Sequence, residues 1–335
     1  MIRTAILGAS GYVGGELLRL LAAHPELAPV RLFGDSKAGQ PLGLVHPHLA
    51  AAYPDATVEK FEDGALDSIG LLFAALPHGH SQRLAAAILD AGIPFVDLGA
   101  DFRLDDAASY ELWYGHAHEA PQLLDCFVYG IPELNRAEIK AAKAVAAAGC
   151  YSTAAILALK PLVDAGLVDP QTLIVDAASG VSGAGREAKE ATCFSTVDAS
   201  FSAYGLLNHR HTAEMEMALG GTVLFTPHLA PMSRGILATC YAAASRACDP
   251  LATLRDAYAA EPFVHVTEQP PATKWLTGSN GVQLTARYDV RTNRILTLSA
   301  IDNLGKGAAG QMIQCANLMF GLDESAGLTT IGVTP

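Results

Sequence analysis

Cys150 is the residue of this sequence whose surroundings best suit nucleophilic chemistry. The apolar run 144–148 is typical of a buried strand, Gly149 allows a sharp turn, and residues 152–160 are typical of a helix that Pro161 would end. Cys150 is therefore expected between the end of a strand and the start of a helix. Helix amides and the helix dipole stabilise a thiolate there, and the thiolate is the reactive form. The alternative is a small buried cysteine at a crowded turn.

Two histidines near a predicted helix start are the candidate proton carriers. His209 and His211 flank Arg210, and Glu214 follows three residues later. A neutral imidazole can exchange protons near pH 7, and a carboxylate can orient its ring. Capping or surface histidines are the alternative. Arg210 has the planar fork that suits carboxylates and phosphates, as do two other arginines beside loops, Arg103 and Arg234.

Histidine pairs raise the question of a metal. Eight of the 11 histidines lie in H-x-H pairs, at 46/48, 78/80, 116/118 and 209/211. Alternation along a strand would put both rings of a pair on one face. No third ligand recurs at a suitable spacing, whereas structural zinc sites need a nearly complete set of nitrogen and sulfur ligands. The sequence therefore predicts no metal site.

A glycine-rich turn at residues 8–14 has the context of a dinucleotide site. A predicted strand, 4–7, precedes it and an amphipathic helix follows. Such a turn binds a pyrophosphate at the helix N-terminus. The spacing is G-x-x-G-x-x-G rather than G-x-G-x-x-G, and glycine turns also occur without a ligand.

The residues after the second predicted strand, 29–33, bear on the choice of cofactor. Asp35 would hold the ribose hydroxyls of NAD, whereas Ser36 and Lys37 would suit the 2′-phosphate of NADP. We favour NADP because the Ser-Lys pair supplies both a hydroxyl and a positive charge.

Strands and helices alternate up to about residue 150, which predicts a doubly wound parallel sheet. Longer strands then dominate, at 172–177, 222–226, 235–244, 282–288 and 295–301, and predict a second, α+β domain built on an antiparallel sheet. We expect a dinucleotide-binding Rossmann domain at 1–149, completed by a C-terminal helix within 306–335. A catalytic domain would then occupy 150–305.

Composition excludes several classes of function. The chain has 335 residues, with 22 Lys and Arg against 34 Asp and Glu, so its net charge of −12 argues against nucleic acids and anionic membranes. The six cysteines show no disulfide or zinc pattern. The N-terminus enters a strand directly, without a signal peptide, and no apolar run reaches membrane-spanning length. We expect a cytoplasmic location.

Together these features suggest one reaction type. A cysteine thiolate would attack an activated acyl carbon and form a thioester, which hydride from a nicotinamide would then reduce. An acyl phosphate would be the natural donor, with phosphate as the leaving group.

Eleven stretches spread over nearly the whole chain resemble the N-acetyl-gamma-glutamyl-phosphate reductases of arginine biosynthesis in their common bacterial form. They are 8–21, 45–49, 75–81, 97–104, 110–118, 129–136, 149–153, 179–192, 209–216, 226–239 and 303–311. The resemblance implies a Rossmann domain with a glyceraldehyde-phosphate-dehydrogenase-like catalytic domain, NADPH as cofactor, and a homo-oligomer, usually a tetramer.

The resemblance also implies roles for individual residues. Cys150 matches the nucleophile and His211 the acid/base. The substrate stretches contain Arg103, Ser182, Gly183, Tyr204, His209 and Glu214. The cofactor stretches contain Gly8, Ser10, Gly11, Tyr12, Val13, Ser36, Gly180, Asn303 and Lys306, and Lys37 joins them through the argument for NADP.

Some positions depart from the family pattern, and alternatives remain. Ser152 and Ala213 stand where the family usually has proline, and Ala147-Ala148 where it has Asn-Pro. These positions shape the backbone and affect how Cys150 and His211 are aimed. A lysine-pathway reductase of carrier-bound aminoadipyl phosphate, an aspartate-semialdehyde dehydrogenase and a non-catalytic NADP-binding regulator are the alternatives.

Overall fold

The computed structural model describes residues 1–62 and 64–334, and the chain divides into two compact units. The first comprises Met1–Ala148 and Ala308–Leu328, and the second comprises Gly149–Gly307 with the chain from Thr329 onward.

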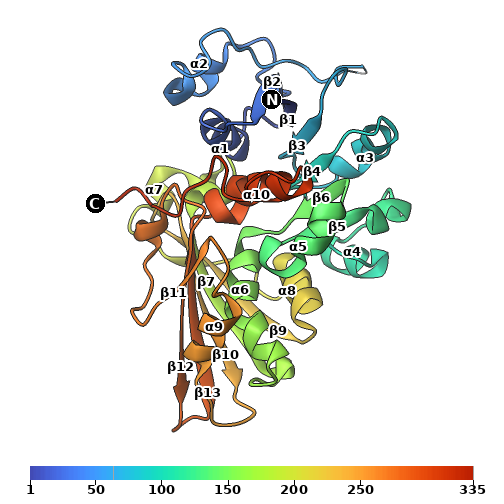
Figure 1. Ribbon diagram of the computed structural model, residues 1–335. Coiled ribbons are helices and arrows are strands. Elements are labelled where there is room, and N and C mark those ends of the chain that lie inside the picture. The colour runs from blue at the N-terminus through green and yellow to red at the C-terminus, as the bar shows by residue number, and fades with distance from the viewer. Residues whose placement is uncertain (63, 335) are drawn as a thin grey trace. The chain divides into compact units, whose positions relative to one another are not determined.

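The first unit is a parallel sheet of six strands in the order β2-β1-β3-β4-β6-β5 (Figure 1). Its strands are β1 (Ile2–Leu7), β2 (Leu27–Phe33), β3 (Leu71–Ala74), β4 (Phe95–Asp97), β5 (Phe127–Gly130) and β6 (Ala144–Ala147). Its helices are α1 (Tyr12–Leu21), α2 (Leu42–Val45), α3 (Ser81–Asp90), α4 (Ala107–Tyr114), α5 (Pro132–Ala141) and α10 (Gly310–Met319), with short 3₁₀ turns at Pro47–Leu49 and Pro121–Cys126.

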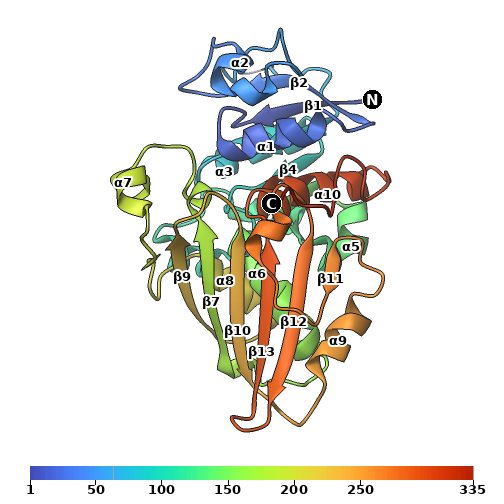
Figure 2. The same ribbon diagram turned by 90° about the vertical axis from the view of Figure 1, so that its left-hand side faces the viewer.

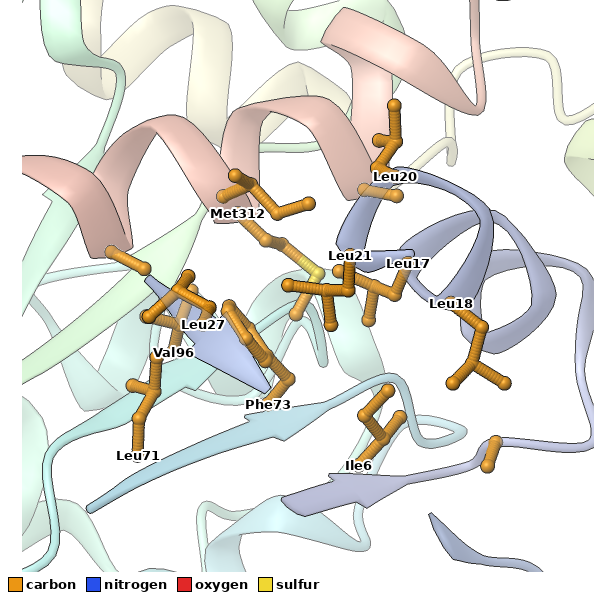
Figure 3. Close-up of a cluster of buried hydrophobic side chains, with 14 of the residues drawn as sticks. Ile6, Leu17, Leu18, Leu20, Leu21, Leu27, Leu71, Phe73, Val96 and Met312 are labelled. Atoms are coloured by element: carbon orange, nitrogen blue, oxygen red, sulfur yellow. The ribbon is translucent and has the colours of Figure 1, made fainter. Parts of the chain in front are cut away.

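Both faces of this sheet are buried, as a doubly wound fold requires. Successive residues of β1 enter opposite cores, because Ile6 packs with α1 and α10 whereas Leu7 packs on the side of α3. Figure 3 shows Leu17 of α1 and Met312 of α10 converging over Phe73 of β3. The predicted Rossmann architecture is therefore confirmed.

Strand order reverses between β1 and β3, and such a switch point is where doubly wound sheets bind ligands. Gly8 follows β1 with a φ of +82°, and a Cβ there would lie 2.3 Å from the carbonyl oxygen of Ala75, just beyond β3. Only glycine lets the two connections approach this closely. The glycine-rich turn thus begins at the switch point.

The second unit is a seven-stranded sheet in the order β11-β12-β13-β10-β7-β9-β8 (Figure 2). Its strands are β7 (Leu173–Gly180), β8 (Ser202–Ala203), β9 (Val223–Ala230), β10 (Ile236–Ala243), β11 (Val264–Val266), β12 (Val282–Asp289) and β13 (Arg294–Ile301). The sheet is mixed rather than purely antiparallel, because β7 runs parallel to β9 and β11 parallel to β12. Its helices are α6 (Cys150–Asp164), α7 (Phe194–Val197), α8 (His211–Leu219) and α9 (Pro250–Ala257), and a π-helical turn, Gly305–Ala309, leads out of the unit.

The two faces of this sheet differ. Helix α6 packs on β10 and β13, where residues such as Cys240 are fully buried. The alternate residues form a half-exposed apolar row across four neighbouring strands: Leu224, Ile174, Tyr241 and Leu296. This apolar row lies on the face opposite α6.

Helix α6 is longer at both ends than the sequence indicated. It begins at Cys150 rather than at residue 152, and it continues through Pro161 to Asp164. Proline removes the N–H that would bond the carbonyl of Leu157, four residues earlier. The hydroxyl of the buried Tyr258 donates to that carbonyl instead, at 2.7 Å, so the carbonyl of Leu157 keeps a hydrogen-bond donor. The predicted end at Pro161 is therefore wrong.

This arrangement predicts a coupling between Tyr258 and Pro161. Tyr258→Phe should lower the free energy of unfolding by about 1–3 kcal/mol, because a buried carbonyl loses its partner. In a Pro161→Ala background the new N–H can bond Leu157, so the same change should cost less. Denaturant unfolding of the four combinations measures the coupling, and Tyr288→Phe, which removes an exposed hydroxyl contact with Asn293, is the control. Equal losses in both backgrounds would contradict the coupling.

Candidate active site

Cys150 is the first residue of α6 and follows the cap residue Gly149, as expected for an activated thiol. Its side chain is neither fully buried nor fully exposed. A Cβ on Gly307 would lie 2.8 Å from the Cβ of Cys150, so the loop passing the cysteine has room only for glycine. Sequence reasoning did not single out Gly307, because this contact joins residues far apart in the chain.

Glu214 connects the cysteine turn to the histidine helix. It lies in the first turn of α8, is fully buried, and accepts the N–H of Gly149 at 2.9 Å through Oε2. Its Oε1 lies 3.9 Å from Nε2 of His211. One carboxylate therefore holds the residue before Cys150 and faces the ring of His211. The family resemblance implies a substrate-pocket role for Glu214, and that role stays a prediction beside these two contacts.

Tyr151 is a residue of this site that sequence reasoning did not assign. Its hydroxyl donates to the carbonyl of His228 at 2.9 Å and accepts from the hydroxyl of Tyr204 at 3.1 Å. Its ring meets the rings of His209 and His211 edge to face, at centroid distances of 5.6 and 5.9 Å. Tyr151 therefore fixes the position of both imidazoles.

The phenols beside the cysteine remain neutral. Burial raises the pKa of Tyr204 to about 12, and the negative charge of a Cys150 thiolate acts in the same direction. Burial also raises the pKa of Tyr151, with further contributions from Tyr204 and Cys150. Both hydroxyls are thus hydrogen-bond donors at neutral pH.

His209 is held as a neutral imidazole. Its Nδ1 accepts the backbone N–H of His211 at 3.2 Å, so Nε2 carries the ring proton. Burial lowers its pKa to about 4, and the charge of Arg210 acts in the same direction. His209 therefore caps the first residue of α8 and has no second proton to give at pH 7. This environment separates it from His211.

A second cluster of candidate residues forms around Asn303. Its amide nitrogen donates to Oγ of Ser182 at 2.9 Å, and its amide oxygen accepts the N–H of Gly235 at 2.7 Å. A Cβ on Gly183 would lie 3.7 Å from the same amide nitrogen. Gly180 ends β7 directly before this loop. The structure thus brings Asn303 to two predicted residues, Ser182 and Gly183, from a distant part of the chain.

Lys306 follows Asn303 by three residues. Its side chain is fully buried, and Nζ lies 6.0 Å from the ring centroid of Phe263. The cofactor role that the resemblance implies for Lys306 stays a prediction.

In the first unit the candidate cofactor residues surround the start of α1. Gly8, Ser10, Gly11, Tyr12 and Val13 run from the end of β1 into that helix, whose cap residue Gly11 has no side chain to cover the first amides. A Cβ on Gly34 would lie 3.0 Å from Oγ of Ser10, so the turn after β2 adjoins the glycine-rich turn. Asp35, Ser36 and Lys37 follow Gly34 in the turn after β2, and all three are exposed.

Arg234 and Arg103 each bond a group within their own unit. Arg234 forms an ion pair with the buried Asp302 at 2.9 Å, which assigns it to the fold rather than to anion binding. Arg103 is buried in the first unit, where its guanidinium donates to the carbonyl of Leu98 at 2.6 Å.

The histidine pairs do not assemble metal ligands. Within residues 1–62 and 64–334, no three His, Cys, Asp or Glu side chains are grouped so that they could hold a metal ion. His118 instead donates through Nε2 to the carbonyl of Asp101 at 2.7 Å and accepts the N–H of Ala120 at 3.0 Å. It is a structural histidine of the first unit.

Cys193 is a thiol whose pKa is lowered by its local contacts. It is exposed, and hydrogen bonds from the Ser195 and Thr196 side chains lower its pKa. Sequence reasoning considered only Cys150, because the contacts of Cys193 arise from the local turn that opens α7.

Comparison with known proteins identifies both units. A family model for the semialdehyde dehydrogenase NAD binding domain matches residues 3–142, and one for the dimerisation domain matches residues 150–303. The N-acetyl-gamma-glutamyl-phosphate reductases of Moorella thermoacetica and Desulforudis audaxviator are 45% and 48% identical to this chain over 347 residues, covering 100% of both chains in each case. The solved aspartate semialdehyde dehydrogenase II of Vibrio cholerae has the same fold, with a TM-score of 0.73 at 18% identity, covering 96% of this chain and 99% of that chain.

The environment of His209 predicts a pH-dependent stability. In the unfolded chain a histidine binds a proton below about pH 6.5, whereas folded His209 does so only near pH 4. The unfolded state therefore binds more protons between these values, and stability should fall as the pH falls through this range. In a His209→Asn variant, the new amide would keep an acceptor for the N–H of His211 without titrating.

Thermal unfolding of His209→Asn between about pH 7 and pH 5 should show a shallower fall in Tm than the parent protein. The exposed His48 provides the control, since His48→Asn should leave the slope unchanged. Equal slopes for His209→Asn and the parent would mean that His209 is not held neutral.

Proposed function

We infer, because the chain belongs to the N-acetyl-gamma-glutamyl-phosphate reductase family, that it reduces N-acetyl-gamma-glutamyl phosphate with NADPH. The products are N-acetylglutamate semialdehyde and phosphate, and the reaction is a step of arginine biosynthesis. The observation that carries this inference is Cys150 at the start of α6, held beside His211 through the buried Glu214. The lysine-pathway and regulator alternatives are not favoured, because full-length relatives carry the reductase name.

Cys150 acts as the nucleophile in this proposal. Its thiolate attacks the acyl carbon, the C–O bond to the phosphate breaks, and the products of this step are a thioester and inorganic phosphate. NADPH, when bound, supplies the hydride that reduces the thioester. His211 donates a proton to the resulting oxyanion and takes it back as the C–S bond breaks, which releases the aldehyde and restores the Cys150 thiolate.

Glu214 and His209 support these steps from within the second unit. The Glu214 carboxylate faces Nε2 of His211 and fixes its ring, as acidic residues do for catalytic histidines. Neutral His209 has its Nε2–H available as a donor, which suits binding of a carboxylate or phosphate oxygen rather than proton transfer. We assign further substrate contacts to Arg103, Ser182, Gly183 and Tyr204, in keeping with an anionic substrate.

The first unit fits NADPH. Gly11 leaves the first amides of the ten-residue helix α1 uncovered by a side chain, and these suit a pyrophosphate. Ser36 and Lys37 would hold the 2′-phosphate, since both are exposed beside the glycine-rich turn. Gly180 and Asn303 belong to the second unit and are proposed as further cofactor contacts. We propose residues 1–149 with 306–335 as the NADP-binding domain and 150–305 as the catalytic domain.

A homo-oligomer follows from the family, and we propose a tetramer. The apolar row of Leu224, Ile174, Tyr241 and Leu296 supports an interface on the second sheet, because such faces are normally covered. Sedimentation equilibrium would test this number of subunits.

We also propose a cytoplasmic location, supported by six cysteines that are all thiols in the described part of the chain. No helix among those residues is long and apolar enough to cross a membrane.

The acyl-phosphate assignment is tested by running the reaction in reverse. With N-acetylglutamate semialdehyde and NADP, reduction of NADP should require inorganic phosphate or arsenate, because only such an anion takes the acyl group from Cys150. Absorbance of NADPH measures the rate. Full-rate reduction in buffer free of both anions would refute the assignment, and Cys150→Ser serves as the inactive control.

The roles of the two histidines predict different kinetic effects. His211→Asn should lower kcat by at least about a hundredfold, as loss of a general acid typically does. His209→Asn should mainly raise KM for the acyl phosphate and leave kcat nearly intact, because it removes a binding contact. Steady-state kinetics of both variants decides this, and loss of kcat in the His209 variant alone would invert the assignment.

A further inference from the structure

Residues 41–53 form a segment that the proposed function does not yet explain. This segment, which we call the strap, contains α2 and the 3₁₀ turn Pro47–Leu49, and it joins β2 to the rest of the first unit beside α1. It includes the stretch 45–49, one of the stretches that carry the family resemblance. Two strap side chains bond neighbouring backbone: His46 bonds the glycine-rich turn, and Tyr53 bonds α1.

His46 contacts the glycine-rich turn directly. Its side chain is buried, and its Nε2 lies 2.9 Å from the carbonyl oxygen of Ala9. Because a carbonyl can only accept, Nε2 is the donor and carries the ring proton. A Cβ on Gly15 would lie 2.7 Å from Cε1 of the same ring, so the space opposite α1 is filled by the imidazole. The ring is therefore locked between the turn and the helix.

This hydrogen bond fixes the peptide between Ala9 and Ser10. The peptide is trans and planar, so the N–H of Ser10 points opposite to the carbonyl of Ala9. The neighbouring amides hold the turn in place, since Ala9 N–H donates to the carbonyl of Phe33 and Gly11 N–H donates to that of Gly8. With the carbonyl directed at His46, the Ser10 amide is directed away from the strap.

We propose that His46 is a positioning residue that orients the Ala9–Ser10 peptide so that the Ser10 amide faces the pyrophosphate of NADPH. This inference rests on the proposed use of NADPH at the glycine-rich turn. Rotating the peptide would replace an amide donor by a carbonyl oxygen, which repels a phosphate. His46 thus affects cofactor affinity without touching the cofactor.

Tyr53 provides a matched control on the same strap. Its hydroxyl donates to the carbonyl of Leu18 in α1 at 2.8 Å, so it attaches the strap to the helix but not to the glycine-rich turn. If the strap only stabilises the first unit, loss of either bond lowers Tm and leaves NADPH affinity unchanged. If His46 orients the peptide, only its loss weakens NADPH binding.

Two quantities are measured for each full-length variant: the Kd for NADPH, by fluorescence titration, and the Tm. His46→Leu should weaken binding by about tenfold, the loss of one charge-assisted hydrogen bond, whereas Tyr53→Phe should lower Tm and keep Kd within about twofold. His46→Gln should recover most of the affinity, because its amide nitrogen reaches the position of Nε2. His46→Asn, whose shorter amide cannot reach Ala9, replaces His46→Leu if that variant fails to fold.

Unchanged Kd in the variants that lose the donor would overturn the inference, as would equal weakening by Tyr53→Phe or failure of His46→Gln to recover affinity. Failure of the parent protein to bind NADPH would instead overturn the proposed cofactor. The two failures are therefore distinguishable.

Discussion

The hydrogen bond from the Gly149 amide to the buried carboxylate of Glu214 is the constraint on which the second unit's chemistry depends. It joins the turn before Cys150 to the first turn of α8, and the same carboxylate faces His211. A fully buried carboxylate is tolerated only when its oxygens have such partners. Loss of Glu214 would therefore release both the turn before Cys150 and the ring of His211, which lie at the starts of two helices, α6 and α8, that pack directly on each other.

Burial assigns different tasks to neighbouring groups of the same type. His209 and His211 are two residues apart, yet His209 is desolvated, accepts a backbone amide and lies beside Arg210, so it stays neutral. His211 faces a carboxylate instead. Burial likewise keeps Tyr151 and Tyr204 protonated beside Cys150. The site thus separates proton transfer from hydrogen-bond donation by local environment rather than by residue type.

At the proposed pyrophosphate site, the first unit relies on backbone geometry in place of charged side chains. Gly8 allows the approach of the β3 connection, and the His46 ring occupies the space left by Gly15. These contacts hold a short turn in one conformation, and a pyrophosphate site built from amides requires such rigidity. The acidic surface of the chain is compatible with this solution, because amides bind phosphate without a net charge.

The sequence by itself determined the two-domain α/β architecture, the glycine-rich turn and the position of Cys150 at a helix start, because these follow from local patterns of apolar residues and glycine. Tertiary structure decided what local patterns do not contain. Helix α6 continues past Pro161 because Tyr258 bonds the released carbonyl of Leu157, which is 101 residues away in the chain. Arg234 pairs with Asp302, Glu214 bonds Gly149, and His46 reaches Ala9, all across long stretches of chain. Such partners are set by packing, so the sequence could name the reacting residues but not the groups that position them.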